Sequence, residues 1–254
     1  GLRAPLDAPR GMGTIVHKVL QDFHAPDATH PFEVSTLRNL LEVHWDHSQF
    51  LFAPIAEQSR RDALEYIDRY IYHHPTRHHA RAVEQAFTFS IAGLNISGKV
   101  DAIFSLPEGT EIVDFKTGRT PMSTTTAKDD LQLGLYSLAF DHATELESYA
   151  SPHRAVYLYL SALKSPEESD RARPTTIVDG TRLRATNPAD RETVASKLEG
   201  YATSIRNRDF PTKNQLLARD QGVPPGDLEV VQNKAVCEYC DFRRLCPDYS
   251  TTPT

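Results

Sequence analysis

Two acids and a lysine occur within a short stretch of the sequence whose pattern is typical of a β-hairpin. In residues 97–118, SGKVDAIFSLPEGTEIVDFKTG, two runs rich in β-branched and aromatic residues flank the turn-forming segment PEGT. Because side chains alternate along a strand, Asp114 and Lys116 should share one face, with their apolar neighbours in the core. Asp101 adds a carboxylate from the first run. We expect the acid and the lysine to stand exposed, side by side, at the strand end.

This set of groups suits hydrolysis of a phosphodiester with a divalent metal. The reaction needs an in-line water, a metal to stabilise the anionic transition state and help for the leaving oxygen. Carboxylates such as Asp101 and Asp114 are hard ligands suited to Mg²⁺ or Mn²⁺, and Lys116 could position the water or stabilise charge on the phosphate. His17 could add a nitrogen ligand, which favours Mn²⁺ over Ca²⁺. The alternative for Asp114 and Lys116 is an ordinary ion pair at a strand end.

Predicted helices and strands must bring these residues together. Apolar residues at helical spacing after Gly13 place His17 near the start of a helix. Gln132 and Tyr136 are four residues apart on a predicted helix from about 127 to 142, so they share one of its faces. The other expected elements are helices at about 33–46, 56–73 and 188–207, and strands at 83–92, 155–163 and 175–179.

Composition and charge bound the class of protein. The chain has 254 residues, of which 39% are hydrophobic and 24% charged, as in an ordinary globular domain. Its net charge of -6 argues against a protein that coats polyanions but leaves room for a local basic groove. No apolar run approaches the roughly 20 residues that span a bilayer, and the first residues lack the apolar core of a signal peptide. We expect a cytoplasmic protein with no membrane partner.

A near match to a phosphate-binding loop lies just before the hairpin. The segment GLNISGKV at 93–100 has the spacing GxxxxGK, but Val100 stands where a Ser or Thr must bind Mg²⁺. A strand is also expected after the lysine, where that motif requires a helix. We therefore reject an ATP site and, with it, helicase activity within this chain.

All three cysteines are close together near the end of the chain, at Cys237, Cys240 and Cys246. An odd, clustered set is a poor disulfide framework and a better ligand set for a metal or an iron–sulfur cluster. It is one ligand short of four. A zinc-binding protein without nuclease activity is the corresponding alternative.

Taken in order, these motifs resemble the RecB-type nuclease family of the PD-(D/E)XK superfamily, including its iron–sulfur, AddB-type branch. The resemblance is carried by GTIVH at 13–17, GKVD at 98–101, DFKTG at 114–118, Gln132 to Tyr136, and Cys237 to Cys246. It implies an α/β fold with a restriction-endonuclease-like core, in which a central mixed sheet is flanked by helices. It also implies a single domain over 1–254, with a helical insertion at about 24–80 and a Cys-rich tail at 237–246.

The resemblance assigns roles to individual residues. It implies that Mg²⁺ or Mn²⁺ is held by His17, Asp101, Asp114 and the carbonyl of Phe115. It makes Lys116 the catalytic lysine, helped by Asp101 and Asp114, and turns Gln132 and Tyr136 toward DNA or the scissile phosphate. Glu84 matches a recurrent glutamate of the family and is a further candidate. One departure is Ala102, which stands where the family often has an arginine after the aspartate.

The resemblance also implies that Cys237, Cys240 and Cys246 are ligands of a [4Fe–4S] cluster. In that branch the fourth cysteine precedes the motif histidine, which here means a position at or before residue 1. The chain would then be a fragment of a larger helicase–nuclease. The alternative is that the cysteine cluster is incomplete and holds no metal. The expected function is a metal-dependent DNA nuclease, an exonuclease acting on single strands or DNA ends in repair, recombination or end processing, with a fused or partner helicase. The alternative is a non-catalytic DNA-binding module of a helicase complex.

Overall fold

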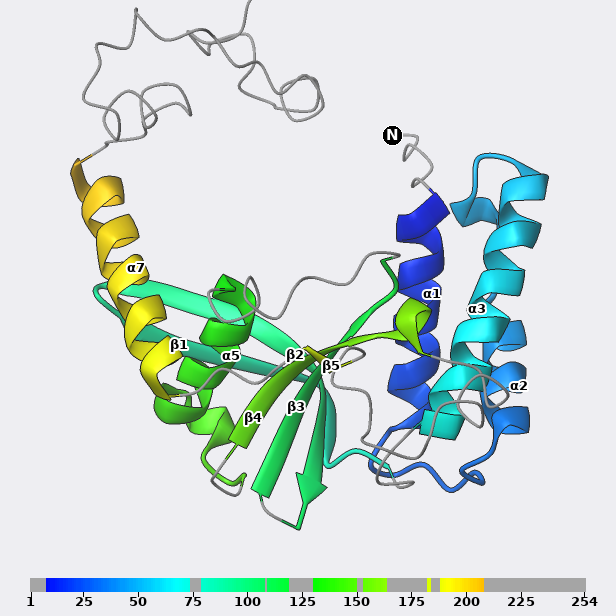
Figure 1. Ribbon diagram of the computed structural model, residues 1–254, viewed down its shortest axis with the longest axis horizontal. Coiled ribbons are helices and arrows are strands. Elements are labelled where there is room, and N and C mark those ends of the chain that lie inside the picture. The colour runs from blue at the N-terminus through cyan, green and yellow to red at the C-terminus, as the bar shows by residue number, and fades with distance from the viewer. Residues whose placement is uncertain are drawn as a thin grey trace, which may run out of the picture. The chain divides into compact units, whose positions relative to one another are not determined.

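A mixed sheet of five strands, in the order β1-β2-β3-β4-β5, carries the acids and the lysine (Figure 1). Its strands are β1 (Ala82–Ile91), β2 (Leu94–Leu106), β3 (Gly109–Lys116), β4 (His153–Tyr159) and the short β5 (Arg182–Leu183). Neighbouring strands are antiparallel except β3 and β4, which are parallel. A parallel pair needs a crossover, and α5 (Leu131–His142) lies within it.

Helices cover both faces of this sheet (Figure 1). On one face, α1 (Ala8–Phe23), α2 (Val34–His44) and α3 (Ala53–His73) share a hydrophobic core with β2, β3 and β4. On the other face, α5 and the first part of α7 (Pro188–Asn207) pack through Leu133, Val194 and Leu198. Short 3-10 helices occur at His47–Gln49, Thr144–Leu146 and Leu160–Ala162.

The computed structural model describes residues 8–73, 79–107, 109–118, 130–149, 153–163, 182–183 and 188–207. The chain divides into two compact units, Gly1–Glu199 and Gly200–Thr254, and the sheet with its covering helices belongs to the first. None of the described helices combines the length and apolar character needed to cross a membrane.

Strand β3 lies inside the sheet and is buried on both faces. Val113 and Phe115 belong to the core under α1, α2 and α3, whereas Ile112 belongs to the core under α5. The prediction that Asp114 stands exposed is therefore wrong, since only 3% of this residue is accessible. The alternation of faces along the strand was correct, but helices cover both faces.

Most predicted elements are confirmed, with their differences at the ends. Helix α1 begins at Ala8 rather than after Gly13, since the helix accommodates both glycines of its first turns. The strand expected at 155–163 ends at Tyr159 and continues as a 3-10 turn. Helix α5 begins at Leu131, and the strand expected at 175–179 falls outside the described residues.

The hairpin between β1 and β2 excludes the phosphate-loop reading directly. Gly93 has a φ of 75° in the tight turn, and the residues from Leu94 onward form β2 rather than a helix. A φ in the left-handed region is readily adopted by glycine, which explains its place there. The segment is a β-turn followed by a strand, as the sequence predicted.

Candidate active site

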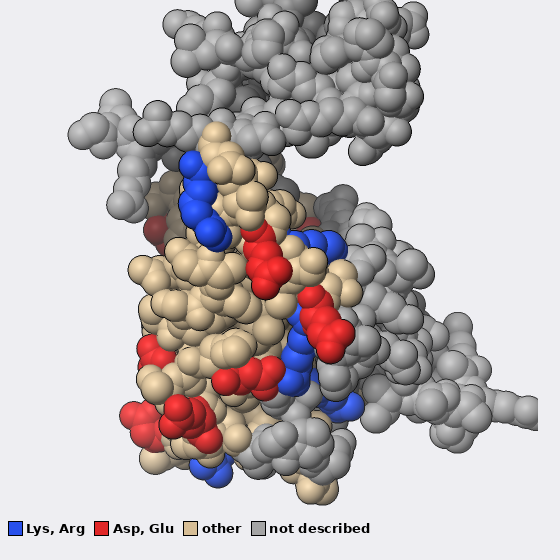
Figure 2. Space-filling model, turned by 90° about the vertical axis from the view of Figure 1, so that its left-hand side faces the viewer, with Lys and Arg blue, Asp and Glu red and all other residues tan. Residues whose placement is uncertain are grey.

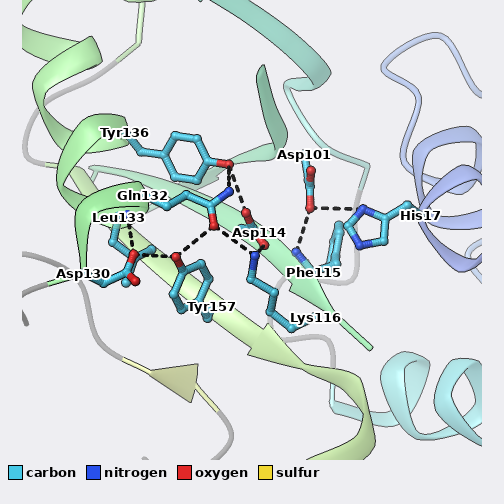
Figure 3. A network of polar contacts seen from close by, with 10 residues as sticks. All are labelled: His17, Asp101, Asp114, Phe115, Lys116, Asp130, Gln132, Leu133, Tyr136 and Tyr157. Atoms are coloured by element: carbon cyan, nitrogen blue, oxygen red, sulfur yellow. Dashed lines mark hydrogen bonds and ion pairs between the residues drawn. The ribbon is translucent and has the colours of Figure 1, made fainter. Parts of the chain in front are cut away.

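Asp114 and Lys116 lie at the end of β3 and point to the α5 side of the sheet (Figure 3). The ammonium of Lys116 is 2.7 Å from Asp114 Oδ1, close enough for an ion pair. Its direction misses hydrogen-bond geometry, and no described residue donates a hydrogen bond to this buried oxygen. The other carboxylate oxygen, Oδ2, accepts a hydrogen bond of 2.9 Å from the Tyr136 hydroxyl.

Gln132 and Tyr136 close these contacts into a ring of side chains (Figure 3). Lys116 Nζ donates to Gln132 Oε1 at 3.0 Å, and Gln132 Nε2 donates to the Tyr136 oxygen at 2.9 Å. Tyr136 then donates to Asp114, which completes the ring. The structure thus joins the predicted lysine, one predicted acid and both predicted α5 residues. The ring fixes where the lysine charge lies.

Tyr157 and Asp130 belong to this network and were missed by the sequence reasoning. The Tyr157 hydroxyl lies 2.5 Å from Asp130 Oδ1 and 2.9 Å from Gln132 Oε1, and its ring lies under the lysine, with Nζ 4.5 Å from the ring centroid. Asp130 caps α5 by accepting the Leu133 N–H at 3.0 Å. An aspartate just before an apolar helix is a recognisable capping signal. No sequence signal pairs Tyr157 with Asp114, since only the parallel register does so.

Both phenols of the network act as hydrogen-bond donors near neutral pH. Burial, reinforced by the nearby Asp114 carboxylate, raises the pKa of Tyr136 far above its usual range. Burial and the contact with Asp130 do the same to the pKa of Tyr157. A phenol has one proton to give, so Tyr157 can serve either Asp130 or Gln132 at a time.

Asp101 lies at the α1 side of the same corner, next to His17 (Figure 3). Its Oδ2 accepts the Phe115 N–H at 2.8 Å and lies 3.3 Å from His17 Nδ1. Burial raises the pKa of Asp101 to about 6; His17 opposes this shift and Asp114 adds to it. The protein interior therefore penalises the charge of Asp101, and a cation close by would relieve that penalty.

A local break in β-strand alternation explains why Asp101 meets His17. In β2, Val100 belongs to the core under α5, but Ala102 belongs to the core under α1, although the two are two residues apart. Across from them in β1, Glu84 has a φ of 49°, a left-handed conformation unusual for this residue. Such backbone conformations cluster at active sites and ligand-binding sites.

A cavity of about 440 Å³ opens beside His17. It is lined by Gly13, Thr14, His17, Lys18, Gln21 and Glu84. Glu84, a candidate from the sequence, thus faces the same space as His17. Its carboxylate pairs with Lys99 at 2.8 Å.

Over residues 1–247 the sequence matches the PD-(D/E)XK nuclease superfamily. The chain belongs to that superfamily. The predicted fold class, a central mixed sheet flanked by helices, is therefore confirmed both by the family and by the observed topology.

Two individual proteins are also similar to this PD-(D/E)XK chain. It is 25% identical over 166 residues to the Gene 69 protein of Mycobacterium phage L5, a match that covers 65% of the chain and 44% of the phage protein. The chain thus spans less than half the length of that relative. A solved structure titled "Crystal structure of SSO0001" covers 96% of both chains at 16% identity, with a TM-score of 0.34.

PD-(D/E)XK nucleases usually use divalent metals, and the donor chemistry at this corner suits one. A buried carboxylate, a partly buried one and an imidazole nitrogen come from neighbouring elements. Asp114 Oδ1 has no hydrogen-bond donor among the described residues. However, no group of three or more His, Cys, Asp or Glu side chains within the described ranges converges closely enough to hold an ion. Asp101 is turned to His17 and Asp114 to Lys116, so the predicted ligand set with the Phe115 carbonyl stays a prediction.

Two further points concern the rest of this nuclease-family chain. Cys237, Cys240 and Cys246 lie outside the described residues, so the predicted iron–sulfur ligands stay a prediction.

On the face seen in Figure 2, the described acidic and basic side chains are interspersed, with uncharged surface between them. That part of the molecule presents no continuous basic track for a nucleic-acid backbone.

Proposed function

We propose that this chain is a metal-dependent deoxyribonuclease whose centre is the corner formed by β2, β3, α1 and α5. The observation that carries the proposal is the ring that holds the Lys116 ammonium 2.7 Å from Asp114, beside the pair of Asp101 and His17. A fixed ammonium beside a carboxylate supplies a preorganised positive charge, which favours attack on a phosphodiester.

Each side chain has a role in this proposal. Asp101, Asp114 and His17 would hold Mg²⁺ or Mn²⁺, with the Phe115 carbonyl as a further ligand. The metal would supply charge stabilisation and activation of a water. Lys116 would orient that water or stabilise the negative charge that develops on the phosphate. Gln132 and Tyr136 keep the lysine aimed at Asp114 before substrate arrives.

The finer assignment is also a proposal. The order of the motifs supports a RecB-type enzyme, an exonuclease that acts on a single strand or a DNA end in repair or end processing. A single domain with a helical insertion at about 24–80, a [4Fe–4S] cluster on the Cys-rich tail and a fused or partner helicase would follow from that assignment.

The direct test is cleavage of end-labelled single-stranded DNA with Mn²⁺ or Mg²⁺. We expect wild type to cleave, Lys116→Ala to lose cleavage, and Lys197→Ala on α7 to behave as wild type. Equal cleavage by wild type and Lys116→Ala contradicts the role of the lysine. The absence of cleavage by wild type in either metal contradicts the nuclease proposal.

The second candidate is a non-catalytic DNA-binding module. One observation favours it: among the described residues, the candidate metal-ligand side chains face protein partners rather than a common point. Wild type that binds DNA tightly but does not cleave it, with or without metal, would select this candidate. Release of labelled nucleotides that depends on Asp114 would reject it.

A further inference from the structure

We propose that the cavity beside His17 binds a phosphate group of the nucleic-acid strand next to the bond that is cleaved. The proposal rests on the proposed function, because it assigns the ligand of a space adjoining the same centre. The phosphate could be a backbone diester or a terminal monoester, which offer the same oxygens to the cavity.

One side of the cavity is a polar stripe along α1. Thr14, Lys18 and Gln21 follow His17's face of the helix at the three- and four-residue spacing that places side chains together. Seven residues of helix extend about 10 Å. A hydroxyl, an ammonium and an amide thus lie on the face of α1 that carries His17, and the ammonium and the amide can donate hydrogen bonds to phosphate oxygens.

Lys18 is held over this stripe by its neighbours. Its ammonium donates to Gln21 Oε1 at 3.1 Å and to Asp22 Oδ1 at 2.8 Å. An ammonium has three N–H groups, so within the described residues one donor remains for a ligand. His44 from α2 contacts the other Asp22 oxygen at 2.7 Å, which ties Asp22 in place. Burial raises the pKa of Asp22, but the hydrogen bonds with Lys18 and His44 outweigh burial and lower that pKa below its usual value.

The charge of the opposite side is compatible with an anion. Glu84 is the one acidic residue among those lining the cavity, and Lys99 neutralises it at 2.8 Å. Lys18 is the basic residue that lines the cavity, and its own partner Asp22 is not among the lining residues. Charged hydrogen bonds to phosphate are stronger than neutral ones, so this lysine should dominate the affinity.

The cavity is continuous with the reaction centre. His17 lines it and also contacts Asp101. Gly13 also lines the cavity and packs so close to the end of β3 that an added Cβ would lie 3.0 Å from Thr117 Oγ1. Thr117 directly follows Lys116. A nucleic-acid strand whose scissile phosphate lies at Lys116 can therefore continue along α1.

The test measures binding in the full chain carrying Lys116→Ala, so that cleavage does not interfere. Fluorescence anisotropy with a labelled single-stranded oligonucleotide gives the affinity over a range of salt concentrations. Each phosphate contact to a single strand contributes about 0.7 to the slope of log affinity against log salt. We expect Lys18→Gln to lower the slope by about that amount, and Lys197→Gln on α7 to leave it unchanged. An unchanged slope for Lys18→Gln overturns the proposal.

Further arms separate the sources of phosphate and guard against misfolding. An equal loss with and without a 5′-phosphate on the oligonucleotide assigns a backbone diester, and a loss confined to the phosphorylated oligonucleotide assigns a terminal monoester. Asp22→Asn keeps Lys18 but removes the negative charge paired with it, so we expect a higher affinity for the oligonucleotide, and a loss of affinity contradicts a phosphate contact by Lys18. The melting temperature of each variant shows whether it is folded. The salt effect does not depend on cleavage. A slope change without wild-type cleavage therefore supports the cavity and contradicts only the nuclease activity.

Discussion

The two carboxylates at the end of the sheet have opposite surroundings. Asp114 is buried in a closed ring in which Lys116, Gln132 and Tyr136 are already bound to one another. Asp101 contacts a partly exposed histidine and one backbone N–H, and that histidine lines an open cavity. The Asp114 side is organised by the protein before any ligand arrives. On the other side, the negative charge of Asp101 is poorly compensated by the protein, so a bound cation would stabilise this carboxylate more than it would stabilise Asp114.

The protonation behaviour of the two sides differs in the same sense. On the Asp114 side, burial keeps the phenols of Tyr136 and Tyr157 protonated as donors. On the Asp101 side, burial raises the pKa of the acid itself to about 6. We therefore expect substitutions on the Asp114 side to affect cleavage through the position of Lys116. Substitutions on the Asp101 side should instead change how cleavage depends on pH and on the metal.

The largest effect is expected from breaking the ion pair on the Asp114 side. Lys116→Ala or Asp114→Asn should lower kcat by about 10²- to 10³-fold, the usual effect of losing one preorganised electrostatic group. Single-turnover cleavage of labelled DNA at saturating metal measures it. Lys197→Ala is the matched control, and a Lys116→Ala enzyme within twofold of wild type would contradict the comparison.

Removing the hydroxyl that Tyr136 donates to Asp114 should cost stability as well as activity. Tyr136→Phe leaves a buried carboxylate oxygen without its donor, so we expect a loss of about 1–3 kcal/mol in the free energy of unfolding. Urea denaturation measures the loss, and kcat should fall while KM changes little. Tyr149→Phe, whose ring packs on Phe140 at the same face, is the control. Equal effects of both substitutions would contradict a special role for the ring.

The pH dependence should come from the Asp101 side. Because the folded pKa of Asp101 is raised from 3.8 to about 6, protonation favours the folded state. Its contribution to stability is fully present below pH 3.8 and is lost as the pH rises through about 6. Metal-dependent cleavage should show the reverse trend and rise over the same interval, since a metal needs the carboxylate.

Thermal melting and cleavage rates between pH 4 and pH 8 test this expectation. Asp101→Asn should remove this component of the pH dependence of the melting temperature. A profile of Asp101→Asn that coincides with that of wild type would assign the titration to another group.

The smallest predicted effects form a pair of opposite sign. Glu84 adds to the raised pKa of Asp101, so Glu84→Gln should move the midpoint of the pH–rate profile downward, by less than about one unit. Lys99→Gln removes the partner that neutralises Glu84 and should move the midpoint upward. Shifts in the same direction would show that neither residue acts through the charge of Asp101.

The regular periods of strand and helix made part of the site predictable. A period of two put Asp114 and Lys116 on one face of β3, and a four-residue spacing put Gln132 and Tyr136 on one face of α5. Both relations hold within one element, and the structure confirms them. Tyr157 could not be found in this way, because its contact depends on the register between β3 and β4.

The sequence by itself determined the superfamily, the mixed sheet, the order of the main helices and strands, and the relative faces of residues close along the chain. Only the tertiary structure decided that Asp114 is buried, that Lys116 is held in a ring, and that Asp101 faces His17 across a break in strand alternation. Local patterns fix how an element is built, because they depend on backbone period. Burial and pairing depend on which elements pack together, and that is settled when the helices cover both faces of the sheet.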